Sequence, residues 1–116
     1  MSKEINIHLT RQDKEKLYAI AEFIVKNPDK PATINELVKQ SGIYRSKLTA
    51  AFKRTYRTSI YRYILTARMK YAKMLLLQND LPVKSIAREC GYKTVQSFSK
   101  AFKKYYRVTP SRFQRK

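Results

Sequence analysis

The chain has 116 residues, of which 26 are lysine or arginine and 8 are aspartate or glutamate, so it has material for one compact domain and a formal net charge of +18. No apolar run approaches the roughly 20 residues that span a bilayer, the first residues lack a secretory signal, and the single cysteine, Cys90, excludes an internal disulfide, which together favour an intracellular protein. Self-repulsion of this size disfavours a compact chain unless a polyanion neutralises it, so nucleic acid, acidic lipid or an acidic protein is the expected partner and a merely solvated surface is the alternative.

The first predicted helix covers residues 11–26. Its apolar residues recur at helical spacing, and Thr10 and Asp13 are placed to cap its first turn. The prolines within residues 27–31 then break the chain, because proline ends helices and restricts the residue before it. We expect this helix to serve as packing support.

A helix-turn-helix unit is predicted next. Thr33 and Glu36 have the spacing of a capping box that opens a short helix at 34–40, and Gly42 supplies a permissive turn. A second helix follows at about 45–56, with its small, polar and basic residues on the side away from the apolar ones. A short helix, a glycine turn and a second helix have the order and spacing of a helix-turn-helix motif.

A longer helix is predicted at 58–78, capped by Thr58 or Ser59. Its interior contains no glycine, proline or acidic residue, and about 20 residues at ~1.5 Å each extend about 30 Å. Because major-groove segments on one side of B-DNA recur about every 34 Å, a helix of this length could place two DNA-contacting helices one turn apart.

A second unit of the same kind follows the long helix. A helix is predicted at 82–89, with proline at its first position, where the missing N–H costs nothing. Gly91 makes the turn, and Thr94 caps a helix at about 95–106. A short closing helix begins at 109–111.

The two units are copies of one sequence pattern. The segment 51–59 returns nearly residue for residue as 101–109, and a matching apolar frame lies upstream of each copy. Ten residues separate Gly42 from the phenylalanine of the first copy and 11 separate Gly91 from that of the second, so the two turns cannot be identical. Residues 1–36 hold six basic and six acidic side chains, so the entire basic surplus lies with the repeat.

With these residues in place, the chain resembles the DNA-binding domain of the AraC/XylS transcription regulators over essentially its whole length. Three segments of the second unit carry the resemblance: Ile86–Tyr92, Phe98–Lys104 and Val108–Phe113. In the long helix the matching residues are Tyr63, Ile64, Arg68, Ala72, Leu75 and Leu76. The resemblance implies an all-α fold of about seven helices, with two helix-turn-helix subdomains joined by a long central helix. Within a single domain of residues 1–116, it implies a first lobe at 10–57, a linking helix at 58–78 and a second lobe at 79–116.

The sequence departs from the family pattern in two respects. Arg57 and Arg107 stand where the family usually has a glycine that ends a helix in the left-handed conformation, which arginine adopts at a cost of about 1 kcal/mol. We therefore expect these two helix ends to differ locally. Family members often have arginine where Ala50 lies, so a strong guanine contact is expected to be missing from the first unit.

The family contacts base edges in the major groove through the exposed face of the second helix of each unit, here called the recognition helix. By that resemblance, the base-contacting candidates are Arg45, Ser46, Thr49 and Ala50 in the first unit and Val95, Gln96, Ser97, Ser99 and Lys100 in the second. An amide such as that of Gln96 could pair with adenine, Lys100 or Arg45 could donate to guanine, and Val95 or Ala50 could meet a thymine methyl group. The candidates for phosphate contact are Lys53, Arg54, Arg57, Lys103, Lys104 and Arg107. The alternative for each of them is an ordinary surface residue.

The predicted function is that of a sequence-specific, duplex-DNA-binding transcription regulator that inserts two recognition helices into successive major-groove segments. A non-specific architectural DNA-binding protein is the alternative, although a coating protein needs charge but not two distinct surfaces. No paired carboxylates, His-Cys dyad, metal cluster or phosphate loop occurs in the basic half, so we expect neither catalysis nor a cofactor or metal. The expected partners are double-stranded DNA and, by the resemblance, RNA polymerase. The chain is expected to be a cytoplasmic, nucleoid-associated monomer, either by itself or as part of a longer regulator with a sensor or dimerisation domain.

Overall fold

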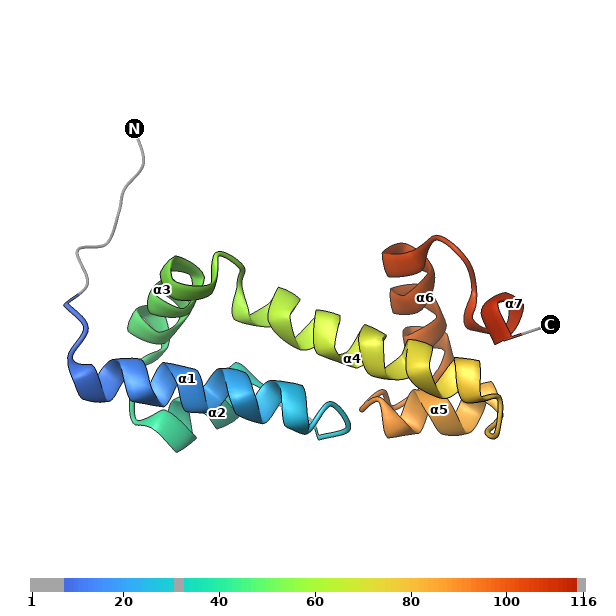
Figure 1. The fold of residues 1–116 in the computed structure, drawn as a ribbon, viewed down its shortest axis with the longest axis horizontal. Helices are drawn as coiled ribbons and strands as arrows, with labels where there is room; N and C mark the ends of the chain where they lie inside the picture. The colour runs from blue at the N-terminus through green and yellow to red at the C-terminus, as the bar shows by residue number, and fades with distance from the viewer. Residues whose placement is uncertain (1–7, 31–32, 115–116) are drawn as a thin grey trace. The chain divides into compact units, whose positions relative to one another are not determined.

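The structure is a computed structural model in which residues 8–30 and 33–114 are described (Figure 1). The regular elements in these ranges are seven helices: α1 (Arg11–Lys26), α2 (Ile34–Ser41), α3 (Arg45–Tyr56), α4 (Ile60–Gln78), α5 (Val83–Glu89), α6 (Val95–Tyr106) and α7 (Pro110–Gln114). The all-α class and the expected number of about seven helices are confirmed. Within the described ranges, no helix is long and apolar enough to cross a membrane.

The helices form two compact units. Unit 1 contains α1, α2, α3 and the start of α4 as far as Ile64, and unit 2 contains the rest of α4 from Leu65 together with α5, α6 and α7. A single helix of 19 residues, α4, therefore contributes to both units. The lobe boundaries expected from the sequence, at 57/58 and 78/79, stay a prediction.

The N-terminus of α1 is capped by the two residues that the sequence predicted. The Thr10 N–H donates to Asp13 Oδ2 at 3.1 Å, and the Asp13 N–H donates to Thr10 Oγ1 at 3.0 Å, so the two residues cap the helix reciprocally. The buried face of α1 consists of Leu17, Ile20, Ala21 and Ile24. This apolar face packs on α2 and α3, which gives α1 the supporting role that its spacing predicted.

The helix-turn-helix of unit 1 is α2 and α3. Thr33 Oγ1 accepts from the Glu36 N–H at 3.1 Å, which is the N-cap bond of the predicted capping box. Gly42 ends α2 in the left-handed conformation at φ +72°, and its N–H donates to the Val38 carbonyl at 2.8 Å. The inward residues of α3 are Leu48, Ala51 and Phe52, all buried as expected.

The core of unit 2 is built on the α4, α5 and α6 faces. Its buried members are Met69, Ala72, Leu76, Ile86, Ala87, Cys90, Phe98 and Phe102. Burial raises the pKa of the Cys90 thiol to about 12, so this cysteine is a small uncharged core residue. One expectation was wrong by a residue: Pro82 is the N-cap of α5 and not its first helical residue, because its backbone is extended at ψ 157°.

The two turns differ, as the unequal spacing predicted. In unit 1 the left-handed Gly42 directly follows α2, whereas in unit 2 Cys90 intervenes between α5 and Gly91, which has φ +87°. A Cβ at Gly91 would lie 3.3 Å from the guanidinium carbon of Arg68, and one at Gly42 would lie 4.0 Å from Lys16 Nζ. A basic side chain thus lies beside the turn glycine in each unit, from α1 in unit 1 and from α4 in unit 2.

The duplication extends further than the sequence repeat indicated. Residues 50 positions apart form matching ring clusters: Phe52, Tyr56 and Tyr63 in unit 1 and Phe102, Tyr106 and Phe113 in unit 2. The start of α4, from Ile60 to Ile64, is therefore the counterpart of α7, and each closes its unit. Likewise, positions 52 apart are buried in the supporting helices: Leu17, Ile20 and Ile24 of α1 correspond to Met69, Ala72 and Leu76 of α4. Consequently α4 is the closing helix of unit 1 continued directly into the supporting helix of unit 2.

Candidate nucleic-acid interface

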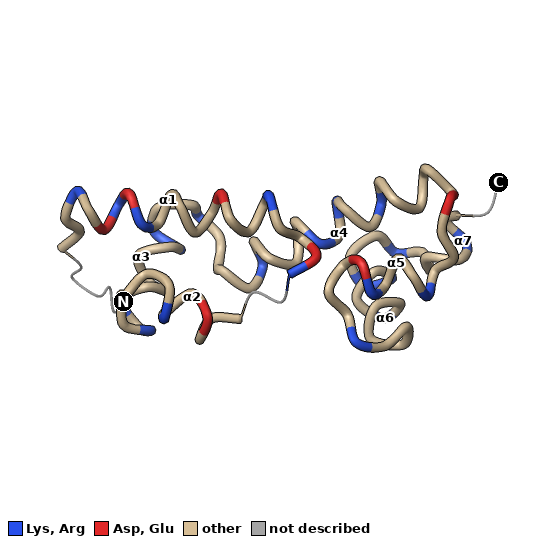
Figure 2. Tube along the Cα trace, turned by 90° about the horizontal axis from the view of Figure 1, so that it is seen from below, with Lys and Arg blue, Asp and Glu red and all other residues tan. Residues whose placement is uncertain are grey.

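Charge is distributed unevenly over the helices. Acidic residues occur on α1, α2 and α5, whereas α3, α4 and α6 carry lysines and arginines and no acidic residue at all (Figure 2). A helix that enters a DNA groove meets phosphates on both sides, so the absence of carboxylates from both recognition helices, α3 and α6, suits that position.

The outer face of α3 carries the candidates of unit 1. Arg45 and Ser46 are exposed, and Thr49 and Ala50 are half-buried. The Arg45 guanidinium donates to Asn35 Oδ1 of α2 at 3.0 Å, which orients it at the first turn of the recognition helix. The Thr49 hydroxyl lies 3.1 Å from the carbonyl oxygen of Arg45, to which it donates, so its methyl group and acceptor lone pairs remain for a ligand.

One basic residue of α3, Lys47, forms an ion pair within the protein. Lys47 Nζ lies 3.1 Å from Asp13 Oδ2, and both side chains are largely shielded from solvent. The Thr10 backbone N–H and the Lys47 ammonium hold the pKa of Asp13 below its usual value, so the Asp13 carboxylate is ionised at neutral pH. Lys47 therefore ties the recognition helix to α1, a role that sequence reasoning missed because 34 residues separate the partners.

The outer face of α6 carries the candidates of unit 2. Gln96, Ser97 and Lys100 are exposed, and Ser99 is half-buried. Thr94 Oγ1 accepts from the Ser97 N–H at 3.0 Å and donates to Ser97 Oγ at 2.9 Å, so the Ser97 hydroxyl proton is left to donate outward. Val95 is half-buried and packs against the core of unit 2, which places it at the edge of the exposed face.

Side chains at equivalent places on the two recognition helices differ in chemistry. The pairs, 50 positions apart, are Arg45 with Val95, Ser46 with Gln96, Lys47 with Ser97, Thr49 with Ser99, Ala50 with Lys100, Lys53 with Lys103 and Arg54 with Lys104. At the centre of the face, unit 1 presents the Ser46 hydroxyl and the Ala50 methyl group. The equivalent groups of unit 2 are the Gln96 amide and the Lys100 ammonium. Towards the helix C-termini both faces are basic.

The candidates for phosphate contact gather at the ends of the recognition helices. Lys53, Arg54, Lys103 and Lys104 are exposed in the last turns. Arg57 and Arg107 follow them in the left-handed conformation, at φ +62° and +71°, and their N–H groups donate to the carbonyl oxygens of Lys53 and Lys103 at 2.8 and 2.7 Å. The expectation that these ends differ locally was wrong, because each arginine adopts the glycine-like conformation itself.

Arg68 supports the turn of unit 2. Its guanidinium lies 5.2 Å from the centre of the Tyr92 ring and beside Gly91, so it holds the turn between α5 and α6 from the side of α4. Its Nε is buried without a hydrogen-bond partner among the described residues. The signal for this role in the sequence is a basic residue, Arg68, next to Met69 in the apolar face of the long helix.

Residues 37–116 match the family described as a helix-turn-helix domain. The chain is 30% identical over 95 residues to the probable transcriptional regulator LumQ of Photobacterium leiognathi, a match that covers 82% of this chain and 38% of LumQ. It spans about a third of the length of such curated relatives.

The chain is similar in fold to solved structures. The C-terminal domain of AraT, a response regulator from Geobacillus stearothermophilus, matches with a TM-score of 0.82 and 26% identity over 93% of this chain and 87% of that one. The DNA-binding domain of AdpA, a global transcriptional factor solved in complex with a target DNA, matches with a TM-score of 0.80 over 85% of this chain and 89% of that one. At 16% identity, the likeness to AdpA shows the fold alone.

Proposed function

This chain belongs to the AraC-type helix-turn-helix family, and we propose that it binds duplex DNA sequence-specifically by inserting α3 and α6 into successive major-groove segments. The observation that carries the proposal is the pair of equivalent recognition helices that lack acidic residues yet present different side chains. Because the outer faces of α3 and α6 carry different side chains at equivalent positions, they are suited to recognise two different base sequences.

Base recognition is assigned to the outer faces. In unit 2, Gln96 has the amide that pairs bidentately with adenine, and Lys100 can donate to guanine O6 and N7. In unit 1, Arg45 is the guanine-contacting candidate, and the Ala50 methyl group suits a thymine methyl. Val95 reaches only the edge of the unit 2 face, so its contribution is expected to be smaller than that of Gln96.

Phosphate contact is assigned to the basic residues at the helix ends, namely Lys53, Arg54, Arg57, Lys103, Lys104 and Arg107. Such contacts fix the position of the protein on the duplex without distinguishing sequences. About six of them would lower the affinity by about 10³ between 50 and 200 mM salt, because each releases condensed counterions.

The length of α4 supports binding as a monomer. Its 19 residues extend about 28 Å at ~1.5 Å per residue, close to the roughly 34 Å that separates successive major-groove segments on one side of B-DNA. One chain could then do what other helix-turn-helix proteins do as dimers. RNA polymerase is the expected protein partner of a transcription regulator, the expected location is the cytoplasm at the nucleoid, and no catalytic activity is expected.

The net charge of +18 favours a second candidate, an architectural protein that coats DNA without sequence preference. Selection from a pool of randomised duplexes, followed by fluorescence-anisotropy titration at two salt concentrations, separates the two functions. We expect an asymmetric site with two preferred blocks about one helical turn apart. Tight binding with no enriched motif would replace the regulator by the architectural protein.

A further inference from the structure

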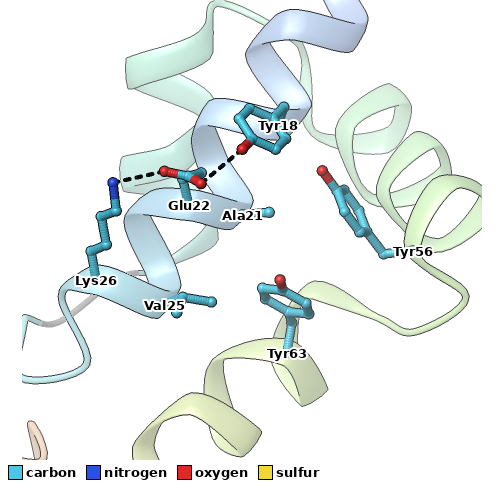
Figure 3. A pocket seen from close by; sticks show the side chains of 7 residues that line it. All are labelled: Tyr18, Ala21, Glu22, Val25, Lys26, Tyr56 and Tyr63. Carbon is cyan, nitrogen blue, oxygen red and sulfur yellow. Dashed lines mark hydrogen bonds and ion pairs between the residues drawn. The ribbon is translucent and has the colours of Figure 1, made fainter.

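Unit 1 has a hollow on its surface of about 160 Å³ between α1, the last turn of α3 and the start of α4 (Figure 3). Its lining residues are Tyr18, Ala21, Glu22, Val25, Lys26, Tyr56 and Tyr63. Three of the seven are tyrosines, and the only charged groups are the carboxylate and the ammonium at the rim. None of these residues is among the proposed DNA contacts.

The polar groups at the rim are arranged around Glu22. Its Oε2 accepts from the Tyr18 hydroxyl at 2.9 Å, and its Oε1 lies 2.9 Å from Lys26 Nζ. Lys26 and Tyr18 together hold the pKa of Glu22 below its usual value, and Glu22 raises the pKa of Tyr18. At neutral pH the rim therefore carries a carboxylate paired with the Lys26 ammonium, and a neutral phenol.

Unit 2 indicates what the hollow is suited to hold. The counterpart of Tyr56 is Tyr106, and the counterpart of Ala21, 52 positions later in the supporting helix, is Lys73. The Lys73 ammonium lies over the Tyr106 ring, 5.6 Å from its centre, which is within the range of a cation–π interaction. At the equivalent position unit 1 has the buried Ala21, whose methyl group cannot supply such a cation to the Tyr56 ring.

The walls of the hollow favour a cation as well. The rings of Tyr56 and Tyr63 have centres 5.7 Å apart and are tilted by 48°, and both side chains extend towards α1, which carries Tyr18 (Figure 3). The faces of aromatic rings are negative, and several of them around one point attract an alkylated ammonium. A cavity of about 150 Å³ holds benzene, so a trimethylammonium group, with fewer heavy atoms, is of suitable size.

We propose that the hollow formed by Tyr18, Tyr56, Tyr63 and Glu22 binds the quaternary ammonium group of a small organic cation. The rings hold the methyl groups, and the Glu22 carboxylate supplies the opposite charge. Because Lys26 already pairs with Glu22, most of the affinity has to come from the rings, and we expect a dissociation constant of about 1 to 10 mM for a single such group.

The first test is a titration of the full chain with choline chloride at constant ionic strength, followed by NMR. The methyl signals of Ala21 and Val25 and the ring signals of Tyr56 and Tyr63 should shift along one saturable curve. The matched control is 3,3-dimethylbutan-1-ol, in which carbon replaces the nitrogen, and it should bind at least about fivefold more weakly. Equal shifts with the uncharged compound, or no saturable shift with choline, would overturn the proposal.

Two variants locate the site. Ala21→Lys places the lysine of unit 2 in unit 1, so its own ammonium should occupy the ring corner and abolish choline binding. Glu22→Gln keeps the acceptor for Tyr18 but removes the charge, and it should weaken choline binding several-fold while leaving the uncharged control unchanged. Thermal melts of both variants check folding. Unchanged choline binding by folded Ala21→Lys would refute the site, and neither measurement requires DNA, so the DNA-binding proposal is tested separately.

Discussion

Arg57 and Arg107 are strained residues in equivalent places. Both have a positive φ, a region in which a residue with a Cβ is less stable than glycine by about 1 to 2 kcal/mol. Arg57→Gly and Arg107→Gly should therefore each raise the free energy of unfolding by up to about 1 kcal/mol, after the larger conformational entropy of unfolded glycine is subtracted. Urea denaturation followed by circular dichroism measures this change.

The same substitutions should lower DNA affinity if the two cations contact phosphate. Each lost contact reduces the slope of log affinity against log salt concentration by about 0.9. Anisotropy titrations at several salt concentrations give that slope. A variant that is more stable, with an unchanged slope, would show that the arginine does not touch DNA. Arg57→Lys, which keeps both the charge and the strain, is the matched control.

Among the elements, the two recognition helices begin differently. Thr94 caps α6 by accepting from the Ser97 N–H, whereas Tyr44, in the equivalent place before α3, makes no side-chain cap. Thr94→Ala should cost about 1 kcal/mol of folding free energy, and Tyr44→Thr should stabilise unit 1 by a similar amount. Chemical denaturation of the two variants and of the wild type checks both signs. Loss of stability on Tyr44→Thr would mean that the exposed tyrosine ring makes a more valuable contact than a cap.

The elements themselves could be predicted from the sequence because their signals are local. Caps such as Thr10 with Asp13, the turn glycines and the 3.6-residue apolar period all act within a few residues, and the helices lie where they indicated. The start of α5 was misplaced by one residue because proline suits both the N-cap and the first helical position.

The missed features depend on contacts that are distant in the sequence. The Lys47–Asp13 pair joins two helices, and the edge position of Val95 depends on how α6 packs against the core. The sequence did not show that the first residues of α4 close unit 1 as α7 closes unit 2. They continue directly into the supporting helix of unit 2, with no cap or break between the two parts. The proposed DNA contacts themselves stay predictions, because they depend on a partner.

For the whole molecule, the duplication explains why α4 is the longest helix of the described chain. Each unit needs a supporting helix, two helices of the helix-turn-helix and a closing helix. In unit 2 the closing helix is separate, as α7, whereas in unit 1 it is fused to the supporting helix of unit 2. The junction lies between Ile64 and Leu65, within continuous helix, so an inserted residue there changes the connection without removing a core side chain from either unit.

Insertion of one alanine between Ile64 and Leu65 tests whether α4 sets the spacing of the two DNA contacts. If α4 stays helical, the insertion turns unit 2 by about 100° and moves it by ~1.5 Å relative to its wild-type position. The variant should remain folded, by circular dichroism and thermal melting, but should bind a selected two-block site hardly better than a site with one block scrambled. The wild type should lose affinity when either block is scrambled, which gives the control within the same anisotropy experiment. A variant that still required both blocks at wild-type affinity would show that the spacing is not set by the helix.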